Sequence, residues 1–147
     1  MRILLRFAIP SDPEAAQKSR ARIEEAVQLI NEDKEEQAIE PAFFTGNLPD
    51  YPDWLREACA RKELLAELET FGACEPGELA EWDLETWYED LLAGETWDLR
   101  LHFEGAGGGT LSYEVEGVHY GGDLPLAFIL FAAGAKGSLE RLSPEET

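Results

Sequence analysis

Acidic side chains at helical spacing are the first candidates for chemistry in this chain. Glu85 and Glu89 lie four residues apart and Glu78 and Glu81 lie three apart, so each pair would share one helix face. Paired carboxylates can act as general acid and general base. Because the chain holds 31 acidic residues, such pairs arise by chance and more often mark a solvated face. We therefore predict that the protein is not an enzyme.

A second candidate site combines Arg100, Glu114 and His119, which fall on the polar side of three strands predicted to be neighbours. Such a row could hold a charged imidazole or a substrate oxyanion. The alternative, which we favour, is a cross-strand ion pair on an exposed sheet, worth under about 1 kcal/mol. A ligand-binding domain or a small enzyme that uses this sheet face stays the alternative functional prediction.

Cysteine, glycine and metal-ligand motifs add no further chemistry. Cys59 and Cys74 form no disulfide framework and no metal spacing, so we expect two free thiols, with Cys59 as a small core residue. The glycine-rich segment 105–109 lies between two predicted strands and lacks the Lys-Ser/Thr of a phosphate-binding loop. The sequence contains no calcium-loop motif and no His-x-x-x-His pair. We expect no cofactor and no metal.

The strongest signal is the acidic stretch 75–135. It holds thirteen acids and one base, Arg100, and supplies −12 of the formal net charge of −19. Trp and Tyr residues lie among these acids. On a protein surface, the carboxylates would attract a cationic partner and the aromatic side chains would hold it in the complex. Eight residues form the predicted partner-binding site: Trp82, Asp83, Glu85, Glu89, Asp90, Glu95, Trp97 and Asp98.

The aromatic residues of this stretch have a second interpretation as core. Leu84, Trp87, Tyr88 and Leu91 recur at helical spacing, which favours a buried stripe with the acids pointing to water. Trp82 lies outside that stripe, and Trp54 stands at a proline-rich junction. These two are the better candidates for surface anchors.

Together these features predict a small acidic, non-enzymatic protein that binds and neutralises a basic protein partner. A cationic toxin or nuclease is a suitable target, because an active site that binds phosphates presents Lys and Arg. In size and charge the chain resembles bacterial immunity and inhibitor proteins. A further hypothesis is an acidic DNA mimic. The acid excess argues against direct binding of nucleic acid or of anionic membranes.

The elements that must position these residues predict an α+β fold. The 147 residues suit a single domain, which we place at 1–142, with a polar tail at 143–147. A strand at 2–9 precedes a helix that Asp12 caps and that runs from Pro13 to about Asp33. An edge strand at 38–44 would follow, reached by a crossover between parallel strands.

The remaining segments predict helices, then a meander. Helices are expected at 53–71, ended by Gly72, and at 83–93. Alternation predicts antiparallel strands at 97–104, 110–115 and 118–120, with Glu104 opposite Thr110. Segment 124–133 is apolar all round and predicts either a central helix or a buried strand, and 138–142 would add one helical turn.

Membrane and export signals are weak. Arg6 interrupts the N-terminal apolar run, which is therefore a strand rather than a signal peptide. The longest apolar stretch, 124–135, is shorter than the roughly 20 residues that span a bilayer. We expect a soluble, cytoplasmic protein.

Overall fold

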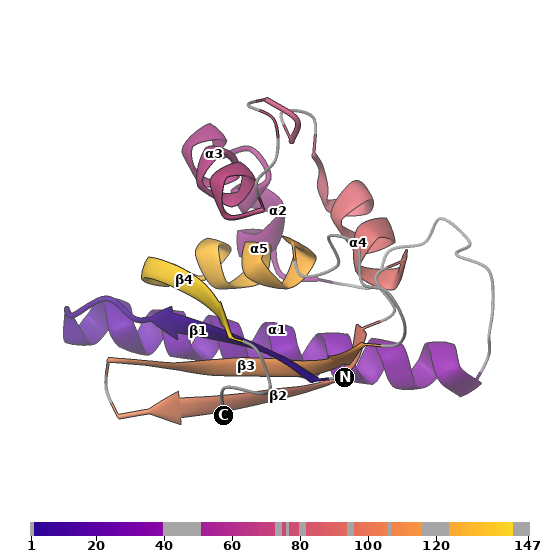
Figure 1. Ribbon diagram of the computed structural model, residues 1–147, viewed down its shortest axis with the longest axis horizontal. Coiled ribbons are helices and arrows are strands. Elements are labelled where there is room, and N and C mark those ends of the chain that lie inside the picture. Colours follow the sequence, from indigo (N-terminus) through magenta and orange to yellow (C-terminus); the bar gives the residue numbers. More distant parts are fainter. Residues whose placement is uncertain are drawn as a thin grey trace.

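A computed structural model describes residues 2–39, 51–72, 75, 77–79, 82–93, 96–105, 107–115 and 124–142. Figure 1 shows a sheet whose strands run along the long axis, with one long helix, α1, along one of its faces. Four shorter helices, α2 to α5, form a second layer above β4 and β1 in this view. The predicted α+β class is confirmed.

The N-terminal strand and helix follow the sequence signals. β1 (Arg2–Ala8) leads into α1 (Pro13–Ile39), and the Asp12 carboxylate accepts a hydrogen bond of 2.9 Å from the amide of Ala15. This is the expected N-cap, with Pro13 as the first helical residue. α1 continues past the predicted end at Asp33, so Ala38 and Ile39 are helical. The rest of the strand predicted at 38–44 lies outside the described residues.

The sheet has the order β2-β3-β1-β4, and every neighbouring pair of strands is antiparallel. Its other strands are β2 (Thr96–Glu104), β3 (Gly108–Val115) and β4 (Lys136–Leu142). β3 and β4 occupy both edges of β1, so a parallel strand after α1 would not pair with β1 directly. The antiparallel three-stranded unit is present as β1-β3-β2.

Two C-terminal predictions also change. The third strand beside β3 is β1 rather than 118–120, which lies outside the described residues. Segment 138–142, predicted as a helical turn, belongs to β4. In both cases β1, which is distant in sequence, is the pairing partner. Pairing with β1 satisfies the backbone amides and carbonyls of β3 and β4, and local sequence propensity does not reveal such long-range pairing.

The β2–β3 register differs from the prediction by two residues. Glu104 pairs with Gly108, and Leu101 pairs with Leu111. Over Arg100–Glu104 this even shift keeps each side chain on its predicted face. At the irregularity between Trp97 and Arg100 the register changes by one more residue, so Trp97 lies opposite Glu114. The hairpin is tighter because Gly108 and Gly109 belong to the strand. A Cβ on either glycine would lie 2.3 Å from a carbonyl oxygen of a neighbouring strand, that of Phe7 or of His102.

The segment predicted as one helix at 53–71 forms two. α2 (Asp53–Ala58) ends in short-range bonds from the amides of Cys59 and Ala60 to the carbonyls of Arg56 and Glu57. α3 (Lys62–Phe71) then starts in a new direction and ends at Gly72, as predicted (Figure 1). Such i to i−3 bonds tighten and close a helix end.

The core is centred on α5 (Leu124–Ala132), which is a helix and not a buried strand. The rings of Trp82 and Trp87 contact Phe128 with centroids 5.2 and 6.1 Å apart. The Trp87 Nε1–H donates a 2.9 Å hydrogen bond to the carbonyl of Pro125. Helix α4 (Leu84–Ala93) is thereby fixed against α5.

Candidate functional site

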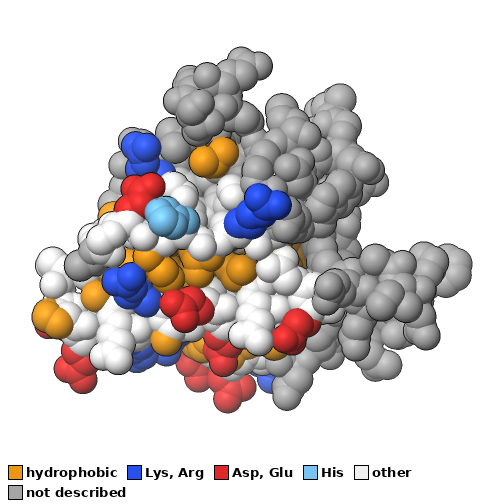
Figure 2. Space-filling view, turned by 90° about the horizontal axis from the view of Figure 1, so that it is seen from below, with side chains coloured by type: hydrophobic (Ala, Val, Ile, Leu, Met, Phe, Trp, Pro, Cys, Tyr) orange, Lys and Arg blue, Asp and Glu red, His pale blue; other side chains and the backbone are white. Residues whose placement is uncertain are grey.

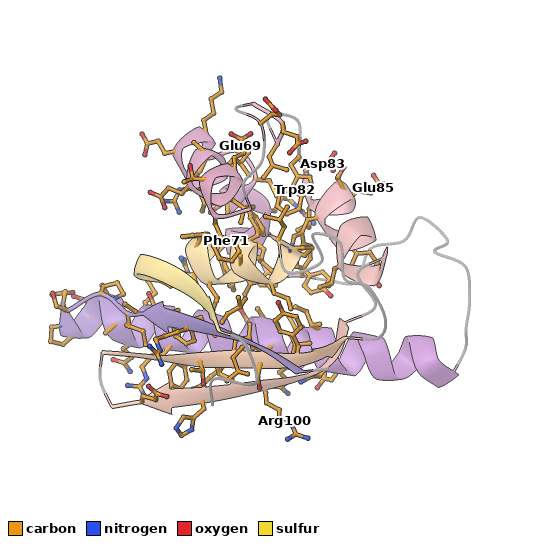
Figure 3. All side chains as sticks on the ribbon, viewed as in Figure 1. Glu69, Phe71, Trp82, Asp83, Glu85 and Arg100 are labelled. Atoms are coloured by element: carbon orange, nitrogen blue, oxygen red, sulfur yellow. The ribbon has the colours of Figure 1, made fainter. Side chains whose placement is uncertain are left out.

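The start of α4 is the best described part of the predicted binding stretch. The Asp83 carboxylate accepts a 2.8 Å hydrogen bond from the amide of Thr86 and so caps the helix. That backbone hydrogen bond, followed by one from the Thr86 side chain, lowers the pKa of Asp83. Asp83 and Glu85 are both exposed, and Figure 3 shows them next to each other at this helix end. Two predicted carboxylates therefore stand together in solvent.

Trp82, predicted as a surface anchor, is a core residue. Its side chain is only 6% exposed and packs edge-on against Phe128, with an interplanar angle of 81°. Trp87 and Tyr88 are buried as well, as their helical spacing predicted. The buried stripe of α4 therefore continues back to Trp82, whose amide donates a hydrogen bond to the carbonyl of Leu79. These aromatics hold the fold and are not free to grip a partner.

Four further predicted residues are placed only by their backbone. Glu89 and Asp90 lie in α4, and Trp97 and Asp98 lie in β2. Glu95 falls outside the described residues.

A buried glutamate that the sequence reasoning missed organises the loop between α3 and α4. Glu69 is 8% exposed, and its two carboxylate oxygens accept hydrogen bonds from the amides of Gly77 (3.1 Å) and Leu79 (2.8 Å). Gly77 has a φ of +84°, which only glycine adopts easily. Glu69 thus fixes the turn that carries the exposed Glu75 and Glu78. Its position four residues after the buried Leu65 was the available signal.

Exposed carboxylates extend from α4 over the other helices of the same layer. Rings of Tyr51 and Trp87 pack 5.1 Å apart, and the charge of Asp83 acts on Cys59, so α2 and the start of α4 are neighbours. We define the acidic helical surface by the eight exposed acids of these segments: Asp53, Glu57, Glu63, Glu67, Glu75, Glu78, Asp83 and Glu85. Among the described residues of 53–85, three exposed bases accompany them: Arg56, Arg61 and Lys62.

The alternative sheet-face site is not assembled as predicted. Arg100 is exposed but lies opposite Ser112, whereas Glu114 pairs with Trp97 and Arg2. The predicted direct pairing of Arg100 with Glu114 is therefore wrong, and the two-residue register shift is the reason. His119 lies outside the described residues. Figure 3 shows Arg100 pointing away from the sheet into solvent.

Figure 2 views the molecule from the β2 side. On this side, His102, the one histidine of the described part, lies near both basic and acidic side chains, and apolar atoms form a band beside them. Both signs of charge are therefore mixed on this side.

Cys59 is not an activated nucleophile. Its Sγ lies 3.6 Å from the carbonyl oxygen of Leu55, and burial, with the nearby charge of Asp83, raises its pKa to about 11. A thiol with this pKa stays protonated at neutral pH and is a poor nucleophile. Cys74 lies outside the described residues. Among the described side chains, no cluster of three or more His, Cys, Asp or Glu could hold a metal ion.

Comparisons of the chain with protein-family models, with curated proteins and with solved structures found no match. Within the part of the chain that the structure describes, no helix combines the length and the apolar composition needed to cross a membrane.

Proposed function

We propose that this is a non-enzymatic protein that binds and neutralises a basic protein partner through the acidic helical surface. The observation that carries the proposal is the gathering of eight exposed carboxylates on one helical layer with three exposed bases. A field of one sign raises the rate at which a cationic partner arrives and favours its correct orientation. A cationic toxin or nuclease is the partner class we favour.

The proposed mechanism relies on carboxylates more than on aromatic anchors, because Trp82, Trp87 and Tyr88 are buried. Carboxylates presented by α3 and by the Glu69-bound turn would occupy the places where phosphates bind in such a partner. Trp54, half-buried on α2 between Asp53 and Leu55, is the aromatic residue best placed at the border of the surface. Its Nε1–H donates to Glu25 at 3.0 Å, which holds the ring in place.

The proposal includes a cytoplasmic location and no bound cofactor. The free thiol of Cys59 is compatible with the reducing conditions of the cytoplasm.

The test compares two variants with the same change in total charge. The surface variant carries Glu63→Gln, Glu67→Gln, Glu78→Gln and Glu85→Gln, all at exposed positions of the acidic helical surface. The matched control carries Glu14→Gln, Glu24→Gln, Glu32→Gln and Glu104→Gln, which are exposed elsewhere. Asp83 and Glu69 stay unchanged because they hold the local structure.

The unmodified protein is used to capture partners from a lysate of the producing cells at low salt, and the partners are eluted with high salt and identified. Calorimetry then measures the affinity of the purified partner for the unmodified protein and for each variant. We expect a stoichiometric basic protein whose affinity falls about tenfold or more for the surface variant and much less for the control. Equal losses in both variants would show that only total charge matters. Failure to capture a basic protein at low salt would overturn the proposal.

A further inference from the structure

A cavity of about 410 Å³ lies at the end of the molecule where α1 begins. Its wall is formed by the chain between β1 and α1, the first turns of α1, and the turn between α5 and β4. Figure 1 shows these three segments together at the left end, where β1 also ends. The volume is within the range of small-molecule sites, roughly 300 to 1,000 Å³.

The turn after α5 gives this cavity a defined wall. Gly134 has a φ of +97°, its amide donates to the carbonyl of Phe131, and the amide of Ala135 donates to that of Leu130. This pattern closes a helix with a left-handed glycine. A Cβ on Gly134 would lie 2.9 Å from the Ser19 Oγ, so the backbone of the turn approaches α1 closely at Ser19.

Ser19 places a hydroxyl at the cavity. Its side chain is 3% exposed and lines the cavity, and no hydrogen bond joins it to the described residues. A ligand atom in the cavity could therefore accept a hydrogen bond from this hydroxyl or donate one to it.

Two basic side chains border the same cavity. Lys18 and Arg22 are one helical turn apart on α1, and both line it. Lys18 forms no ion pair with the described residues, and the Arg22 guanidinium lies 5.4 Å from the centre of the Trp54 ring. In a chain with 31 acidic residues, this end of α1 places two basic side chains side by side at one cavity.

One carboxylate, Asp12, also lines the cavity and would oppose an anion. Its Oδ2 is held by the 2.9 Å hydrogen bond from the amide of Ala15 at the start of α1. Its charge is therefore partly balanced by the helix N-terminus. The walls also include Pro10, Ala15 and Ala133, which offer apolar surface.

We propose that this cavity binds a small ligand that joins an oxyanion to an apolar body. Lys18 and Arg22 would attract the oxyanion and Ser19 would hydrogen-bond to it, while the apolar walls cover the body. A carboxylate and a phosphate monoester share this chemistry. The site is separate from the acidic helical surface and does not rest on the proposed protein partner.

The test is an NMR titration of the ¹⁵N-labelled full chain with benzoate, phenyl phosphate and, as a neutral probe, benzyl alcohol, all at constant ionic strength. We expect saturable shifts at the non-proline amides of 11–22 and at 133–135 with at least one anionic probe. Benzoate alone would identify a carboxylate site and phenyl phosphate alone a phosphate-ester site. Saturation by both would define a general oxyanion site.

Variants assign the response to the named residues. Lys18→Gln and Arg22→Gln should each weaken binding of the effective probe by about tenfold, as expected for loss of a charge-assisted contact. Lys62→Gln and Arg56→Gln, exposed on α3 and α2, are the matched controls and should leave it unchanged. Ser19→Ala removes a hydroxyl without a partner in the described structure, so it should remain folded and bind a few-fold more weakly.

Three results would overturn the proposal. They are the absence of saturable shifts with both anionic probes, equal shifts with benzyl alcohol, and unchanged binding in the Lys18→Gln and Arg22→Gln variants.

Discussion

At the scale of single residues, Glu69 is a buried structural carboxylate, whereas the other acids whose side chains the structure describes are exposed. Both oxygens are engaged by backbone amides of the turn after α3, and the side chain is buried with Leu65 and Leu68. The amides of Gly77 and Leu79 have this carboxylate as their acceptor. Glu69 therefore helps to position the exposed Glu78 of the acidic helical surface, which lies between these two residues.

We predict that Glu69→Ala lowers the free energy of unfolding by about 1 to 3 kcal/mol, because two amides lose their acceptor. Urea unfolding followed by tryptophan fluorescence measures this change. Glu67→Gln, an exposed position on the same helix, is the control and should stay within about 0.5 kcal/mol of the unmodified protein. Equal stability of the two variants would show that the Glu69 contacts contribute nothing net.

At the scale of elements, the edge strand β2 is protected at its irregular point. The register between β2 and β3 shifts between Trp97 and Arg100. Within that stretch the amide of Leu99 donates to the Asn31 Oδ1 (3.1 Å), and the Asn31 Nδ2 donates to the carbonyl of Leu99 (3.0 Å). Helix α1 therefore satisfies backbone groups that an edge strand would otherwise offer to another chain.

We predict that Asn31→Ala lowers the free energy of unfolding by about 1 to 2 kcal/mol and increases self-association, since the backbone of Leu99 loses both partners. Urea unfolding measures the first effect and size-exclusion chromatography with light scattering the second. Gln28→Ala is the control, because Gln28 is exposed on α1 and bonds only to Glu32 within the described structure. If the two variants behave alike, the Asn31 contacts do not protect the edge.

At the scale of the whole molecule, the excess of acids is unevenly shared among the described residues. The acidic helical surface carries eight exposed acids and three exposed bases, whereas the exposed positions of the sheet combine Arg6, Arg100 and His102 with Glu104. A formal net charge of −19 destabilises the compact state by self-repulsion. The same excess of carboxylates that would attract a cationic partner therefore lowers the free energy of unfolding.

We predict that raising NaCl from 10 to 500 mM increases the free energy of unfolding by the order of 1 kcal/mol. Salt screens like-charge pairs that each cost a few tenths of a kcal/mol. Urea unfolding at the two salt concentrations checks this. The surface variant defined above should be more stable at low salt and respond less to salt. A midpoint that is unchanged or falls with salt would contradict the prediction.

Local patterns in the sequence determined several elements of this protein: α1, α4, β2 and β3. Asp12 and Pro13 marked the start of α1, the spacing of Leu84, Trp87, Tyr88 and Leu91 predicted the buried face of α4, and alternation predicted β2 and β3. Capping and periodicity act between residues close in sequence, so a single chain is enough to detect them.

Tertiary structure alone decided which elements meet. Nothing local indicates that β1 separates β3 from β4, that Asn31 reaches Leu99, or that Glu69 binds the turn at 77–79. Likewise, Trp82 lacks a helical stripe in the sequence and is buried only because α5 supplies Phe128. These contacts join distant segments through burial and hydrogen bonding. Their free energy depends on the whole core, and a local pattern does not contain it.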